Sequence, residues 1–142
     1  DQDGERMAYA NSIWVLMDTK KGIPVRVTKE ISDAYGLEPQ LPMQCSERKI
    51  MLPEKYEEKD SLVVPSYFID TNHHMNNSRY VQAAMEYVPK EFRTTEVRVE
   101  YKKAAMCKDV IVPHVTIEDP RVTVALCAPD GQPYAVVVFL KA

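Results

Sequence analysis

The last third of the sequence contains a run of consecutive strand patterns, and this run limits the fold more than any other feature. Val97, Val99 and Tyr101 alternate with charged residues, which is typical of a strand with one buried face. Apolar segments follow at 110–117, 122–128 and 134–140, and short turn sequences separate them. Consecutive strands joined by short turns pair antiparallel, so the sequence predicts an antiparallel sheet.

A helix pattern precedes these strands. Val81, Ala84, Met85 and Val88 have the i, i+3, i+4, i+7 spacing of a helix with one buried stripe, and Pro89 is placed to end it. One helix followed by four strands predicts an α+β fold.

Three polar residues at alternate positions precede this helix. Asp70, Asn72 and His74 supply a carboxylate, a carboxamide and an imidazole. If the segment is extended, side chains two residues apart share a face, and the three could orient a carbonyl, hold a water and move a proton. The alternative is that these are loop residues, with Asn76 and Asn77 as helix-cap candidates.

These residues are part of a longer motif. It reads Phe68-x-Asp70-x-Asn72-x-His74-Met75-Asn76-Asn77-x-x-Tyr80-Val81. This motif resembles the signature of the second domain of plant and bacterial acyl-acyl carrier protein (ACP) thioesterases. The resemblance continues at Val99-Glu100-Tyr101-Lys102-Lys103, at Asp109-Val110 and at Ala10-x-Ser12-x-Trp14-x-x-x-Asp18.

The resemblance implies a hot-dog fold, in which an antiparallel sheet wraps around one long helix. It also implies hydrolysis of fatty acyl-ACP thioesters to free fatty acid and ACP in fatty acid biosynthesis, without a metal or other cofactor. Asn72 would hold the thioester carbonyl or the attacking water. His74 would donate a hydrogen bond or carry a proton, and Asp70 would orient one of these two side chains.

The sequence departs from the family pattern after its Tyr-basic-basic strand. Family members usually carry a glutamate there, whereas this chain has Ala104-Ala105. A methyl group cannot activate water, so activity is in doubt. We do not expect Cys107 to replace the missing glutamate. Glu100 is expected on the same strand face as Ala104, but too distant to act in place of that glutamate. Three alternatives remain: an acyl-coenzyme A hydrolase of the same fold, a degenerate acyl- or ACP-binding domain, and a purely structural half that pairs with a first domain.

The family comparison also predicts the domain organisation. Residues 1–27 would be the terminal hairpin of a first hot-dog domain, with strands at 7–17 and 23–27. Residues 28–60 would form a linker with a short helix at 28–35. Residues 61–142 would be the second hot-dog domain, which carries the motif. Such domains usually pair, so we expect another hot-dog domain or a second copy of the chain as a partner.

Composition excludes several other classes of protein. The 142 residues carry a net charge of -3, and the sequence has no basic run of the kind that binds nucleic acid. No segment approaches the roughly 20 apolar residues of a membrane span. Three widely spaced cysteines indicate free thiols in a reducing compartment, which favours the cytoplasm, and three histidines make a metal site improbable.

Because ACP is acidic, docking would need a local basic patch, for which Arg98, Lys102 and Lys103 are candidates; ordinary solubilising charge is the alternative.

Overall fold

A computed structural model describes residues 15–36, 38–43, 47 and 49–141. The chain divides into two compact units, Asp1–Ser46 and Glu47–Ala142. Each unit is described by itself. No helix within the described residues is both long and apolar enough to cross a membrane.

The first unit contains a hairpin and a short helix. Strands β1 (Leu16–Asp18) and β2 (Ile23–Val25) pair antiparallel, and Gly22 closes the turn with a φ of 66°. Helix α1 (Lys29–Ala34) follows Thr28. The predicted turn and short helix are therefore confirmed, whereas residues 7–14 of the expected first strand lie outside the described part.

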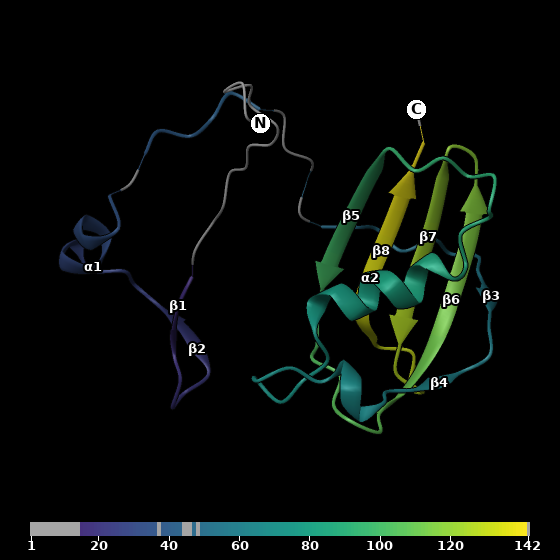
Figure 1. The fold of residues 1–142 in the computed structure, drawn as a ribbon, viewed down its shortest axis with the longest axis horizontal. Coiled ribbons are helices and arrows are strands. Elements are labelled where there is room, and N and C mark those ends of the chain that lie inside the picture. Colours follow the sequence, from purple (N-terminus) through teal and green to yellow (C-terminus); the bar gives the residue numbers. More distant parts are fainter. Residues whose placement is uncertain (1–14, 37, 44–46, 48, 142) are drawn as a thin grey trace. The chain divides into compact units, whose positions relative to one another are not determined.

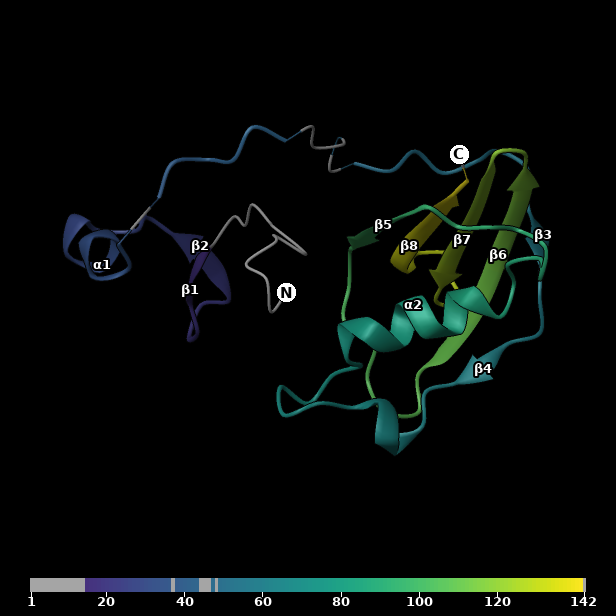
Figure 2. The same ribbon diagram turned by 45° about the horizontal axis from the view of Figure 1, so that its top comes forward.

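The second unit is an antiparallel sheet with one helix across one of its faces (Figures 1 and 2). The strand order is β3 (Glu57–Glu58), β6 (Val110–Glu118), β7 (Arg121–Cys127), β8 (Pro133–Leu140), β5 (Glu96–Tyr101), and β4 (Leu62–Val63) also pairs with β6. A 3-10 turn covers Ser66–Phe68, and helix α2 covers Asn77–Met85. The predicted order of one helix and then four antiparallel strands is confirmed.

Helix α2 is shorter than expected and buries a different stripe. It has nine residues, and Tyr80 and Ala84 are its buried side chains. Met85, which was expected in the core, is 58% exposed, so this part of the prediction is wrong. Ala83, Tyr87 and Val88 pack against the core together with the two buried residues. Their spacing is still helical, but the stripe begins at Tyr80 and runs through Ala84 to Val88, along a different face from the one predicted.

Strands β7 and β8 are buried on both faces. One face belongs to the core that includes Tyr80 and Ala84 of α2. Its side chains are Val122, Val124, Leu126, Ala135, Val137 and Phe139. The other face packs against Ile50, whose backbone N–H donates to Glu100 Oε2 at 2.8 Å. Thr116 Oγ1 donates to the carbonyl of Lys55 at 2.7 Å, and β3 joins the sheet beside β6. The second hot-dog domain was expected to begin at residue 61, whereas the compact unit in the structure begins at Glu47.

Candidate active site

The loop before α2 is a tight turn rather than an extended segment. Ile69 and Met75 form an antiparallel bridge, and Asp70 N–H donates to the carbonyl of His74 at 3.0 Å. Within the turn, His73 N–H donates to the Asp70 carbonyl at 3.0 Å, and Asn72 N–H donates to Asp70 Oδ1 at 2.8 Å. The segment is therefore not extended and the alternation of side chains does not apply to it, because the short-range bonds accepted by Asp70 turn the chain back on itself.

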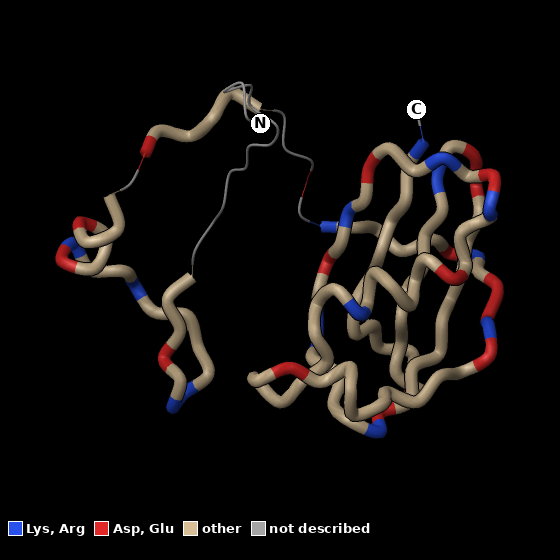
Figure 3. Tube along the Cα trace, in the orientation of Figure 1, with Lys and Arg blue, Asp and Glu red and all other residues tan. Residues whose placement is uncertain are grey.

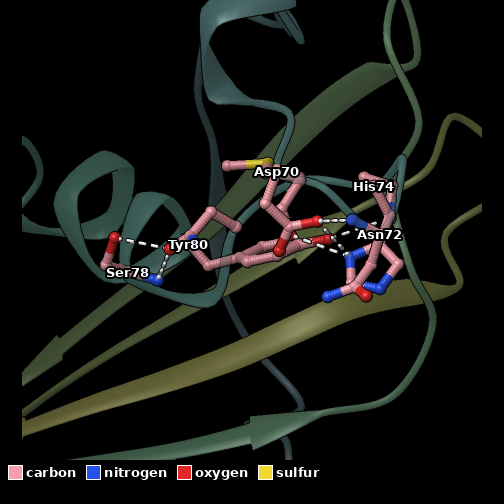
Figure 4. Close-up of polar contacts among 8 residues, drawn as sticks. Asp70, Asn72, His74, Ser78 and Tyr80 are labelled. Carbon is pink, nitrogen blue, oxygen red and sulfur yellow. Dashed lines mark hydrogen bonds and ion pairs between the residues drawn. The ribbon is translucent and has the colours of Figure 1, made fainter.

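The turn brings Asp70 and His74 together at its base. His74 Nδ1 lies 3.9 Å from Asp70 Oδ1 and 3.4 Å from the carbonyl oxygen of Met75 (Figure 4). Both neighbours are acceptors, which favours the tautomer that carries its proton on Nδ1 and leaves Nε2 with a lone pair. Asn72 and His73 lie in the turn and are exposed. Asp70 and His74 are thus close in space, although not for the reason that alternation predicted.

His74 opens onto a shallow pocket of about 210 Å³. The pocket is lined by His74, Met75, Asn77, Tyr80, Tyr101, Lys102, Lys103 and Ala104. Ala104 therefore occupies the wall of the same pocket as the imidazole. Asp70 and Asn72 do not line this pocket, so the structure brings only one of the three predicted catalytic residues directly to it.

Two aromatic residues of the pocket were not predicted as site residues. Tyr80 and Tyr101 meet edge to face with their ring centroids 5.7 Å apart, and Tyr101 Oη donates to the carbonyl of Asn77 at 3.0 Å. Burial raises the pKa of both phenols, so they stay protonated at neutral pH. Both tyrosines belong to the motifs that resemble the family, so the sequence contained a signal for them as site residues. The search for alternating polar residues could not find them.

Glu100 faces away from the pocket. Its carboxylate accepts from Lys102 Nζ and from Ile50 N–H, both at 2.8 Å, and these hydrogen bonds lower its pKa. The expectation that Glu100 shares a face with Ala104 is wrong, because β5 ends at Tyr101 and strand alternation does not continue to position 104. Cys107 is exposed and does not line the pocket.

The three candidate docking cations lie in different surroundings. Lys102 and Lys103 line the pocket, and Lys103 Nζ lies 5.6 Å from the centroid of the Tyr134 ring. Arg98 instead donates to the carbonyl of Glu47 at 2.5 Å, on the face of the sheet that carries Ile50. Basic and acidic residues are interspersed along the second unit (Figure 3). In the described part of the chain, no three His, Cys, Asp or Glu side chains are grouped in a way that could hold a metal ion.

An antiparallel sheet around one helix, with a pocket at the start of that helix, is the hot-dog fold. The family described as acyl-ACP thioesterase C-terminal domain matches residues 52–125. The chain therefore belongs to this family, which confirms the resemblance seen in the motif.

Solved structures agree with this fold. An acyl-ACP thioesterase from Bacteroides thetaiotaomicron superimposes with a TM-score of 0.71 at 16% identity. The 12:0-ACP thioesterase from Umbellularia californica superimposes with a TM-score of 0.69, also at 16% identity. Each match covers 87% of this chain and 52% of the other, so this chain spans about half the length of these two proteins. No curated protein sequence matches the chain.

The backbone of His73 provides a test of the turn. Its φ of 64° lies in the left-handed region, which costs an L-residue roughly 1–2 kcal/mol. We expect His73→Gly to keep the free energy of unfolding nearly unchanged, and His73→Val to lower it by about 1–2 kcal/mol. Urea denaturation measures both. Thr71→Val, at an exposed position of the same turn outside the left-handed region, is the control and should have little effect. Equal stability of the Gly and Val variants would contradict this geometry.

Proposed function

We propose that the His74 pocket hydrolyses a thioester, and that its substrate is a fatty acyl group carried on ACP. The products are free fatty acid and ACP thiol, and the setting is fatty acid biosynthesis in the cytoplasm. The observation that supports this most directly is the half-buried imidazole of His74, with a carboxylate near Nδ1 and a pocket beside it. Family membership supports the choice of an acyl-ACP thioester over other esters.

In this proposal the three polar residues of the turn have separate tasks. His74 Nε2 accepts a proton from water as the oxygen attacks the thioester carbonyl carbon. The carbon–sulfur bond then breaks, and the proton goes to the departing thiolate. Asp70 holds the imidazole in the tautomer that this step requires. Asn72 is exposed in the turn, where its amide can reach a substrate carbonyl or the attacking water once the substrate is bound.

Ala104 leaves one wall of the pocket without a functional group. Its methyl group can neither accept a proton nor hold a water. A positioned general base is worth about two to four powers of ten in rate. The chain with Ala104 should therefore hydrolyse its substrate slowly, with His74 as its base.

The Ala104→Glu variant tests this assignment. A carboxylate on the pocket wall would face the same bound water as His74, so we expect acyl-ACP hydrolysis to rise by roughly 10²–10⁴-fold. Release of ACP thiol from fatty acyl-ACP measures the rate. Ala104→Gln has nearly the same shape without the charge and should give no comparable rise. Adding His74→Ala to the Glu variant should remove the gain, and a gain that persists without the imidazole would contradict its role.

A second function is favoured by the same alanine. A pocket that has lost a catalytic group can still bind an acyl chain or ACP without turnover. Binding of acyl-ACP by the unaltered chain, with no hydrolysis by it or by Ala104→Glu, would establish this alternative. Faster turnover of acyl-coenzyme A than of acyl-ACP would instead identify the chain as the coenzyme A type of hydrolase.

Lys102 and Lys103 are the basic residues best placed for docking, because both stand at the pocket. Arg98 lies on the opposite face of the sheet and is the weaker candidate. We expect the double variant Lys102→Glu and Lys103→Glu to weaken ACP binding. Exposed ion pairs contribute about 0.2–1 kcal/mol each, so the loss should lie between about twofold and thirtyfold at low salt.

The effect of these two lysines should shrink as salt is added, because exposed charges are screened. Arg98→Glu is the matched control for each single variant, Lys102→Glu or Lys103→Glu, since it makes the same charge reversal away from the pocket. Equal losses from Arg98→Glu and from the single lysine variants would show a response to net charge rather than docking at this site.

We also propose that a second hot-dog domain or a second copy of the chain covers strand β5. Strand β5 is the last strand in the order of the described sheet, beside β8. Natural proteins usually cover or otherwise protect strands at the edge of a sheet. Analytical ultracentrifugation should therefore show self-association of the chain at micromolar concentration, and a monomer under those conditions would contradict the proposal.

A further inference from the structure

Three segments that meet at the pocket are joined by two buried hydrogen bonds. Tyr80 of α2 accepts the backbone N–H of Ala105 on its hydroxyl oxygen at 2.8 Å. The carbonyl of Ala105 accepts the backbone N–H of Met75 at 2.8 Å. Tyr80 is 2% exposed, and Met75 and Ala105 are fully buried, so water does not compete for these bonds.

Two residues of this chain of bonds directly follow residues that line the pocket. Met75 directly follows His74, and Ala105 directly follows Ala104. The two bonds therefore set the backbone at position 104 relative to the backbone at His74. Any side chain placed at 104 is directed toward or away from the imidazole by this connection.

The segment that contains Ala105 depends on this connection because the sheet no longer holds it. Strand β5 ends at Tyr101, and the N–H groups of Lys102 and Lys103 both donate to the carbonyl of Tyr134. Beyond that point Ala105 donates to a side chain rather than to a neighbouring strand. A buried N–H that loses its acceptor destabilises the fold, so removing the Tyr80 hydroxyl would favour a different path for this segment.

We propose that Tyr80 is a positioning residue, whose hydroxyl holds position 104 beside His74. The inference rests on the proposed role of His74 in the pocket. It explains why this helix buries a tyrosine, which must satisfy its hydroxyl, where a phenylalanine would fill nearly the same volume.

A thiol introduced at position 104 tests the inference without relying on hydrolysis. Position 104 is exposed, so small reagents can reach it. Ala104→Cys is made together with Cys107→Ser, because Cys107 is also exposed. Thiols react as thiolates, and a neighbouring imidazole that takes up the proton raises the thiolate share. The measurement is the rate of alkylation by iodoacetamide at neutral pH, followed at this cysteine by mass spectrometry.

A double-mutant cycle between His74→Ala and Tyr80→Phe gives the result. We expect the introduced thiol to react roughly threefold or more faster with His74 present than in His74→Ala. In Tyr80→Phe the same comparison should show no difference, because position 104 is no longer held beside the imidazole. Tyr134→Phe is the control, since it removes another buried tyrosine hydroxyl, one that donates to Asp109 at 3.2 Å. The His74 effect should survive in this control.

Two outcomes would overturn the inference. One is a His74 effect of the same size in Tyr80→Phe, and the other is no His74 effect when Tyr80 is present. Absence of acyl-ACP hydrolysis would count against the proposed function but would leave this cycle unaffected. Amide hydrogen exchange on the unaltered chain is a second test. The backbone N–H of Ala105 should exchange as slowly as the backbone N–H groups in the buried turn of α2. Exchange at the rate of an exposed loop would also overturn the inference.

Discussion

Burial of β7 and β8 on both faces is the constraint on which the rest of the second unit depends. Their buried side chains are apolar on the face toward α2 and, apart from Thr123, on the face toward Ile50. Each such side chain contributes about 1.5–3 kcal/mol when it is removed from water. Two layers must therefore cover these strands. Helix α2 supplies one, and the segment that begins at Glu47 supplies the other.

This arrangement also determines where the pocket forms. Helix α2 can lie against the sheet only if the chain turns sharply before it, and the Ile69–Met75 bridge makes that turn. The turn ends at Asn76, whose side chain accepts from Ser78 N–H at 3.0 Å and begins the helix. His74 is thereby left at the helix start, next to the segment that leaves β5. The pocket is the space between these two irregular segments, which a buried hydrogen bond joins to each other and a second one joins, at Ala105, to Tyr80 of α2.

The alanine at position 104 gives this pocket an uncommon chemical character. The imidazole, its carboxylate neighbour and two aromatic walls are present, yet the wall at position 104 is a methyl group. The supporting hydrogen bonds at Tyr80 and Ala105 are intact all the same. Structural support and proposed chemistry thus come from different groups at this site. Backbone groups and a buried phenol make the support, whereas the chemistry that we propose rests on the side chain of His74.

Much of the fold was predictable, since it follows from local patterns. The four strands, the turns between them and the position of α2 could be predicted because burial imposes a period of two on strands and 3.6 on helices. The motif around His74 indicated the family, which the family comparison confirms, and it contains the residues of the candidate site. Periodicity alone misplaced the buried stripe of α2, because Met85 and Tyr80 are both large, and only the packed sheet decides which of them turns inward.

The sequence by itself determined the α+β class, the order of the elements and the family. The tertiary structure alone decided which groups meet. Asp70 approaches His74 through a tight turn, Glu100 faces away from Ala104 because β5 ends first, and Tyr80 reaches Ala105 across 25 residues of chain. Such contacts depend on where regular elements stop and how irregular segments are held. Those features are set by bonds between distant residues, and no local pattern in the sequence records them.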